Sequence, residues 1–195
     1  MEAALDRFRA AGTQVLGVSV DSVHSHANWA SDLGGVSFPL LADFHPKGAL
    51  AQSLGLYLDE AGISDRATVI ADRDGIVRYA VSVGPGGKRD VDELVQACEG
   101  VGGGSASFQP SPVDGAQLFV KSQCGPSRNA RLAVANLHLA DAVRVCNVTD
   151  DAAAAAELEG LGKNQAPCLK IGDEVLFESA DIVRALADRA APLNG

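Results

Sequence analysis

The sequence lacks long uncharged hydrophobic runs, an excess of basic charge and a high density of cysteine. Nowhere do about 18 apolar residues run together without charge, so no membrane-spanning helix is expected. The 16 Lys and Arg against 25 Asp and Glu leave a formal net charge of −9, which argues against a nucleic-acid phosphate backbone as partner. Four cysteines in 195 residues are too few for a disulfide scaffold.

The start of the chain also lacks the pattern of a secretory signal. Glu2 and Asp6 lie where such a signal has a basic region followed by an apolar run. We therefore expect a cytoplasmic protein. What the chain does have is a hydrophobic fraction of 47%, which is enough to form packed cores. Its length allows one large domain or two small ones.

One segment divides the sequence into two parts. Residues 101–115 read VGGGSASFQPSPVDG, and a stretch so rich in Gly, Ser and Pro cannot bury a helix or strand face. We interpret it as a linker. The sequence therefore predicts a first domain over residues 1–100 and a second over residues 116–195.

The first part shows helical and strand patterns that end in a hairpin and a helix. Apolar residues at helical spacing predict a helix over residues 2–11, and two further helices are expected over residues 47–55 and from Asp21 or Ser22 to about residue 33. The β-branched run 13–20 predicts a buried strand. Residues 67–72 and 76–83 flank an Arg-Asp-Gly turn and predict a hairpin, which a helix capped by Asp90 follows. A thioredoxin-like fold ends in this way.

The second part contains the whole pattern of a minimal thioredoxin-like domain, βαβαββα. The expected strands are 116–120, 143–148, 166–171 and 174–178, and the expected helices are about 127–138, 151–160 and 179–190. The predicted fold class is therefore α/β, with two tandem thioredoxin-like domains, the first incomplete at its N-terminus.

Four separated motifs in the first part carry a family resemblance. They are Gly17-Val-Ser-Val-Asp-Ser22, Phe38-Pro-Leu-Leu-Ala-Asp43, Gly55-Leu-Tyr57 and Arg66-Ala-Thr-Val-Ile70. In this order and spacing, residues 12–81 resemble the later part of a peroxiredoxin of the alkyl-hydroperoxide-reductase and thiol-specific-antioxidant type. The resemblance implies that Arg66 polarises peroxide beside an attacking thiolate, because guanidinium donors suit an anionic sulfur. The alternative is an exposed arginine at the start of a strand.

The peroxiredoxin motif that carries the attacking cysteine, Pro-x-x-x-Thr/Ser-x-x-Cys, does not occur in this sequence. Cys98 is preceded by DELVQA and Cys124 by LFVKSQ. The chemistry needs a thiolate, because only a thiolate attacks the O–O bond and becomes a sulfenic acid. We therefore expect an N-terminally shortened peroxiredoxin-like domain that lacks peroxidase turnover of its own. A sheet edge left uncovered in such a domain also predicts self-association, and so a possible homo-oligomer.

The second part resembles a glutaredoxin or the thioredoxin-like N-terminal domain of a glutathione transferase. Lys121-x-x-Cys124 follows an apolar strand, Cys124-Gly-Pro-Ser127 opens a helix, Ala166-Pro167 precedes a strand where the family has a cis-proline, and Glu178-Ser179 opens the last helix. The resemblance implies Cys124 as the catalytic thiol. It also implies a glutathione site formed by Lys121, Ala166, Pro167, Glu178 and Ser179.

The residue types at these positions fit that chemistry. A helix N-terminus lowers the pKa of a thiol and also binds carboxylates. Ser127 stands where a dithiol site has its second cysteine, so a mixed disulfide on Cys124 needs an external thiol, and glutathione is the natural co-substrate. We expect no tightly bound cofactor. We also expect no metal, because His24 and His26, two apart on a helix, do not share a face. The other cysteines, Cys98, Cys146 and Cys168, are predicted to be structural; for Cys168 a resolving or regulatory role is the alternative.

Three functions remain as hypotheses. The first is a thiol-based antioxidant oxidoreductase that acts on a peroxide or disulfide and uses glutathione through a monothiol site. The second is a non-catalytic, shortened peroxiredoxin-like chain that only binds glutathione or a partner. The third is a conjugating glutathione transferase, which would need an all-α domain after residue 195. The cysteine chemistry favours the first.

Overall fold

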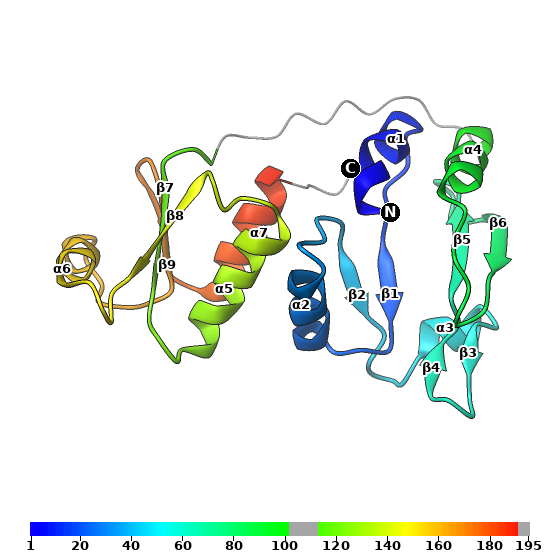
Figure 1. Ribbon diagram of the computed structural model, residues 1–195, viewed down its shortest axis with the longest axis horizontal. Coiled ribbons are helices and arrows are strands. Elements are labelled where there is room, and N and C mark those ends of the chain that lie inside the picture. Colours follow the sequence, from blue (N-terminus) through cyan, green and yellow to red (C-terminus); the bar gives the residue numbers. More distant parts are fainter. Residues whose placement is uncertain (102–112, 191–195) are drawn as a thin grey trace. The chain divides into compact units, whose positions relative to one another are not determined.

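The computed structural model describes residues 1–101 and 113–190 (Figure 1). The described residues fall into two compact units: residues 1–26 and 38–101 form unit 1, and residues 27–37 and 113–190 form unit 2. Most of the predicted linker, residues 102–112, lies outside the described residues. Within the part of the chain that the structure describes, no helix has both the length and the apolar character needed to span a membrane.

A single four-stranded mixed sheet forms the centre of unit 2. Its strands lie in the order β10-β9-β7-β8, with bounds β7 Ala116–Val120, β8 Val143–Asn147, β9 Cys168–Ile171 and β10 Glu174–Leu176. β7 pairs parallel with β8 and antiparallel with β9, and β9 pairs antiparallel with β10. β7 is therefore hydrogen-bonded on both sides, and the loop that follows it leaves the sheet from its interior.

Three helices cover the two faces of this sheet. α5 (Gly125–Asn136) and α7 (Ser179–Ala190) pack on one face, where Leu118 and Leu169 enter a core that also contains Ile182 and Leu186. α6 (Ala152–Gly160) covers the other face, where Phe119 packs with Leu158, Cys146 and Cys168. The alternation of Leu118 and Phe119 between the two cores follows from the two-residue period of a strand.

The sequence pattern predicts the elements of unit 2 closely. β7 has the predicted bounds, and the two antiparallel strands follow in the predicted order. The helix expected at about residue 127 begins at Gly125, because Cys124 is its N-cap and Pro126 is tolerated in a first helical turn. The expected strand 174–178 ends at Leu176.

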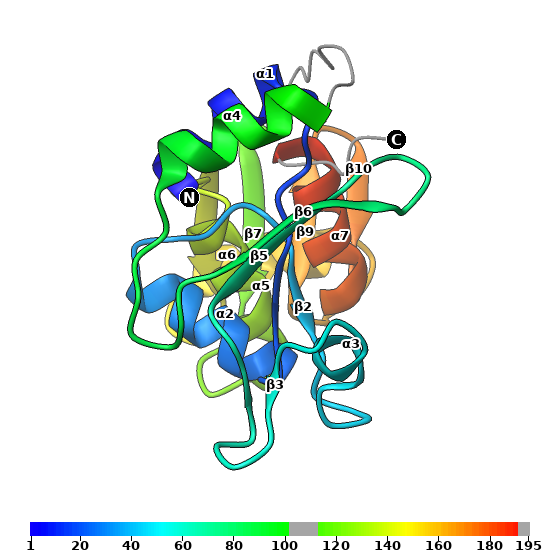
Figure 2. The ribbon, with the colours of Figure 1, turned by 90° about the vertical axis from the view of Figure 1, so that its right-hand side faces the viewer.

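In unit 1, a hairpin packs with two helices. β5 (Ala67–Ala71) and β6 (Val77–Ser82) pair antiparallel with an irregularity between Ile70 and Ala71. The 3₁₀ turn η1 (Glu2–Ala4) leads into α1 (Leu5–Ala10), which contacts α4 (Val91–Val101), as Figure 2 shows. The buried core side chains are Ala4, Phe8, Ile70, Leu94, Val95 and Cys98.

The remaining strands of unit 1 form two separate pairs. β1 (Gly17–Ser19) pairs parallel with β2 (Leu40–Ala42), and β3 (Tyr57–Leu58) pairs antiparallel with β4 (Ile63–Ser64). α2 (Val23–Asp32) begins in this unit, and α3 (Ala49–Ser53) follows β2. The strand expected over residues 13–20 is therefore only three residues long, because only Gly17–Ser19 has a bonded partner. β2, β3 and β4 were not predicted.

Candidate functional site

Cys124 lies where the interior strand β7 passes into α5. The turn between them spans Lys121, Ser122 and Gln123, and Cys124, with φ −108° and ψ 116°, is the N-cap of α5. Gln123 adopts the left-handed region at φ 53°, which is unfavourable for a residue with a side chain. The turn thus places a half-buried thiol at a helix N-terminus, as the sequence predicts.

Hydrogen bonds from Ser127 lower the pKa of the Cys124 thiol from its ordinary value. The largest contribution is the bond from the Ser127 side chain, followed by the bond from its backbone N–H; burial opposes them, and the charge of Lys121 adds a smaller favourable effect. The Lys121 backbone N–H donates to Ser127 Oγ at 3.1 Å. Because a hydroxyl has one proton, the Ser127 proton remains available for the sulfur. Ser127 therefore has a local role that the sequence alone did not reveal.

The pKa values of the other three cysteines are shifted in the opposite direction. Cys98, Cys146 and Cys168 are buried, as predicted, and burial is the main cause that raises the pKa of each. For Cys168 burial raises the pKa to about 11. Thiols with a raised pKa are poor nucleophiles near neutral pH.

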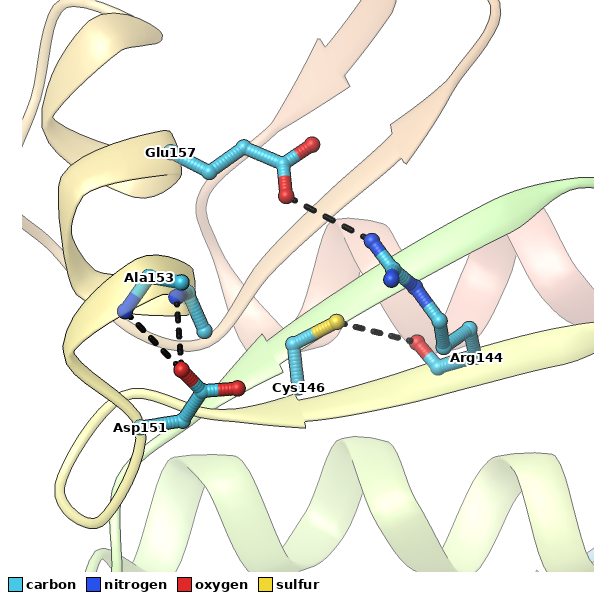
Figure 3. Close-up of polar contacts among 6 residues, drawn as sticks. Arg144, Cys146, Asp151, Ala153 and Glu157 are labelled. Atoms are coloured by element: carbon cyan, nitrogen blue, oxygen red, sulfur yellow. Dashed lines mark hydrogen bonds and ion pairs between the residues drawn. The ribbon is translucent and has the colours of Figure 1, made fainter.

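Figure 3 shows the surroundings of Cys146. Its Sγ donates to the backbone oxygen of Arg144 at 3.8 Å, and Arg144 forms an ion pair with Glu157 of α6 at 3.4 Å. The Asp151 side chain accepts from the backbone N–H groups of Ala153 and Ala154 and so caps α6. Cys146 is thus buried, and its sulfur is bonded to the backbone of its own strand.

The segment before β9 contains the expected cis peptide bond, between Ala166 and Pro167. Gln165 immediately precedes it, and the Gln165 side-chain amide donates to Glu178 Oε1 at 3.0 Å. Glu178 precedes Ser179, the first residue of α7. Two predicted glutathione-binding segments are therefore joined by a hydrogen bond. Sequence reasoning missed Gln165, although its place beside the predicted cis-proline was a usable signal.

Arg66 lies in unit 1, just before β5. Its side chain is exposed, and its Nε donates to the Pro85 backbone oxygen at 3.0 Å. Arg89 lies nearby and donates to Thr68 Oγ1 at 3.0 Å and to the Ala67 oxygen at 2.8 Å. Burial, and then the charge of Arg66, lower the pKa of Arg89. Arg66 and Cys124, the two predicted catalytic residues, belong to different units.

Cys98 is the cysteine of unit 1, and it lies on the buried face of α4, in the core, rather than exposed beside Arg66. In the described ranges 1–101 and 113–190, no group of three or more His, Cys, Asp and Glu side chains is arranged to hold a metal ion. Among the described cysteines, Cys124 is the one whose pKa is lowered.

Comparison with known families matches the two parts of the chain to two different families. Residues 1–80 match the AhpC/TSA family, and residues 118–193 match the glutathione S-transferase N-terminal domain. Alkyl hydroperoxide reductase E of Mycobacterium tuberculosis is 41% identical over 86 residues, which are 44% of this chain and 56% of that protein. A peroxiredoxin of Thermococcus kodakarensis is 38% identical over 105 residues, 49% of this chain and 46% of that protein.

Among solved structures, AhpC of Mycobacterium bovis aligns with a TM-score of 0.47 at 30% identity, over 51% of this chain and 56% of that one. The chain thus spans about half the length of the curated relatives it matches. It carries a partial AhpC/TSA-type peroxiredoxin domain at its N-terminus and a thioredoxin-fold domain like that of glutathione S-transferases later in the chain. Both predicted resemblances, and the α/β fold class, are confirmed.

Proposed function

We propose that the chain is a thiol-based antioxidant oxidoreductase in which Cys124 carries out glutathione-linked thiol–disulfide exchange. One observation carries the proposal: among the described cysteines, Cys124 alone has a lowered pKa, and it lies at a helix N-terminus. The similarity of residues 118–193 to a glutathione S-transferase domain supports glutathione as the co-substrate. All four cysteines are free, which suits a reducing compartment such as the cytoplasm.

The proposed exchange has two balanced steps. The Cys124 thiolate attacks the glutathione sulfur of a mixed disulfide between glutathione and a substrate thiol, so a Cys124–glutathione disulfide forms and the substrate leaves as a thiolate. A second glutathione thiolate then attacks the glutathione sulfur of that adduct, which restores the Cys124 thiolate and releases oxidised glutathione. Ser127 stands where a resolving cysteine would lie, and a hydroxyl cannot take part in the second step.

Binding of glutathione is proposed to use both ends of the tripeptide. Lys121 is exposed three residues before the thiol and would meet the glycyl carboxylate. The Ala166–Pro167 segment would align the peptide, and Glu178 with Ser179 at the start of α7 would hold the γ-glutamyl end. The bond between Gln165 and Glu178 supports a common site, because it fixes one segment relative to the other.

The peroxidase activity of the relatives is not proposed for this chain alone. Arg66 is exposed, but the described cysteine of unit 1, Cys98, is buried in its core with a raised pKa. The role proposed for Arg66 is to polarise a peroxide beside a thiolate that another part of a complete peroxiredoxin would supply.

The test is the pH dependence of Cys124 alkylation by iodoacetamide, combined with mapping of the adduct formed with oxidised glutathione. We expect an inflection below the unperturbed thiol value of about 8.5 and one adduct, on Cys124. Cys124→Ser should abolish the adduct, and the matched variant Cys146→Ser should retain it. An inflection at or above the unperturbed value would overturn the proposal, and glutathione binding without an adduct would favour the non-catalytic alternative.

A further inference from the structure

Two hydroxyl groups hold the turn that precedes Cys124. The Lys121 amide donates to Ser127 Oγ at 3.1 Å, and the next amide, that of Ser122, donates to Thr149 Oγ1 at 3.0 Å. Ser127 belongs to α5, whereas Thr149 lies on the loop between β8 and α6. The turn is therefore attached both to its own helix and to the loop after the neighbouring strand.

Side chains at the end of β8 and in the loop after it reinforce this attachment. The Asn147 amide donates to Ser122 Oγ at 2.9 Å and also to Asp150, and Ser122 Oγ donates to Asp150 Oδ2 at 3.3 Å. Asn147 Oδ1 in turn accepts from the Thr149 backbone N–H at 3.2 Å. The loop that presents Thr149 is thus ordered by the same residues that hold the Ser122 side chain.

The turn needs such support. Gln123, between Ser122 and Cys124, is held in the left-handed region, where a residue with a side chain is disfavoured unless its surroundings impose that conformation. If the Ser122 amide were released, Gln123 could relax, and Cys124 would move from the N-cap position where the Ser127 groups reach its sulfur.

We propose that Thr149 is a positioning residue for Cys124: by accepting a hydrogen bond from the Ser122 amide it keeps the thiol at the N-terminus of α5 and within reach of Ser127. The proposal rests on the proposed reactivity of Cys124. Thr149 acts on the sulfur only through the backbone of the turn, and neither it nor Asp150 is among the groups that shift the pKa of Cys124 directly.

The experiment compares Thr149→Val, which removes the hydroxyl and keeps the shape, with Thr149→Ser, which keeps the hydroxyl. In the full-length chain, Thr149→Val should move the inflection of Cys124 alkylation upward by about 0.3–1 pH unit and slow the reaction at pH 7 by about 2- to 10-fold, as expected for the loss of one hydrogen bond. Thr149→Ser should restore the wild-type profile. A purely structural role would not move the inflection.

A second measurement needs no variant. In the wild-type chain the Ser122 amide should exchange its hydrogen more slowly than the Gln123 amide, which has no acceptor among the described residues. Equal exchange, or a Thr149→Val profile identical to wild type, would overturn the positioning role and leave the proposed function intact. A wild-type inflection at or above about 8.5 would overturn both, because no activated thiol would then be positioned.

Discussion

Unit 1 and unit 2 both resemble thioredoxin-fold domains but differ in how their strands are paired. Unit 2 has one four-stranded sheet with a hydrogen-bonded interior strand and a core on each face. In the described part of unit 1 the strands form separate two-stranded pairs. Parallel strands such as β1 and β2 usually lie in sheets covered on both faces, yet Val18 and Leu41, opposite each other in this pair, are 41% and 45% exposed.

The part of the chain that matches peroxiredoxins is therefore not the part that contains the candidate site. The curated relatives named above, at 41% and 38% identity, align over stretches that make up less than half of the chain, and the AhpC/TSA match covers residues 1–80. Cys124, the thiol whose pKa is lowered, and the hydrogen bonds that hold its turn lie in unit 2, at the ends of β7 and β8. The parallel pairing of β7 with β8 holds the loops that follow these two strands next to each other.

The largest difference should appear in amide hydrogen exchange of the full-length chain. Amides of β7 are bonded within a covered sheet, whereas those of β1 belong to a pair with open edges. We expect β7 to exchange at least about 10³-fold more slowly, which corresponds to about 4 kcal/mol of local stability. β8, an edge strand of the same sheet, is the internal control and should be intermediate. Similar protection of β1 and β7 would contradict the contrast.

The two units should differ in how much stability they lose when a strand side chain is shortened to alanine. Leu118 is fully buried, so Leu118→Ala should destabilise unit 2 by about 2–5 kcal/mol. The exposed Val18 serves as the control, and Val18→Ala should cost no more than about 0.5 kcal/mol. The readout is labelling of the buried thiol of each unit, Cys168 or Cys98, which should speed up about 30-fold or more for Leu118→Ala and about 2-fold or less for Val18→Ala. Comparable acceleration in both variants would show that the β1–β2 pair is as tightly packed as the sheet.

The cysteines of the two units should differ in oxidation. After brief exposure to hydrogen peroxide, mass spectrometry should find sulfenic acid on Cys124 and none on Cys98, because the sulfenate forms from a thiolate and burial raises the pKa of Cys98. Cys146, which is also buried, provides the matched control. A rapid, stoichiometric sulfenate on Cys98 would mean that unit 1 carries its own peroxide-reactive thiol.

Stability should depend on pH through Cys168. Burial raises the pKa of Cys168 to about 11 in the folded state, against about 8.5 in the unfolded chain. The stability linked to this thiol is thus fully present below about pH 8.5 and is lost as pH rises toward 11. The free energy of unfolding of unit 2, measured with urea, should decrease as pH rises through this window. In Cys168→Ala this free energy should depend less on pH. Cys124→Ser is the control; it removes a thiol whose shift has the opposite sign. An unchanged slope in Cys168→Ala would contradict the assignment.

The smallest expected effect concerns glutathione affinity. Glu178→Ala or Ser179→Ala should weaken glutathione binding several-fold without changing the alkylation profile of Cys124, because these residues are proposed to hold the γ-glutamyl end rather than the sulfur. Gln165→Ala should have part of the same effect through its bond to Glu178. Arg66→Ala, in unit 1, is the control and should leave the affinity unchanged. A shifted alkylation profile in Glu178→Ala would place this residue near the thiol instead.

Much of unit 2 could be predicted from the sequence because its elements have strong local signals. The apolar run of β7 and the Ala-rich segment of α6 predict elements that the structure contains, and the family resemblance predicts the cis bond before Pro167. The short strands β2, β3 and β4 of unit 1 had no such signal. Each consists of two or three residues that become a strand only because a partner lies beside them.

The sequence by itself determined that the chain combines a peroxiredoxin-like and a glutathione S-transferase-like part, and that Cys124 opens a helix with no second cysteine in its turn. These are properties of neighbouring residues, and local patterns record them. Only the tertiary structure decided that Thr149, 25 positions after Cys124 by number, holds the turn before the thiol, and that Gln165 reaches Glu178. Those contacts exist because the pairing of β7 with β8 and β9 brings loops that are distant in the sequence to the same end of the strands. A pattern of neighbouring residues does not record which distant loops meet.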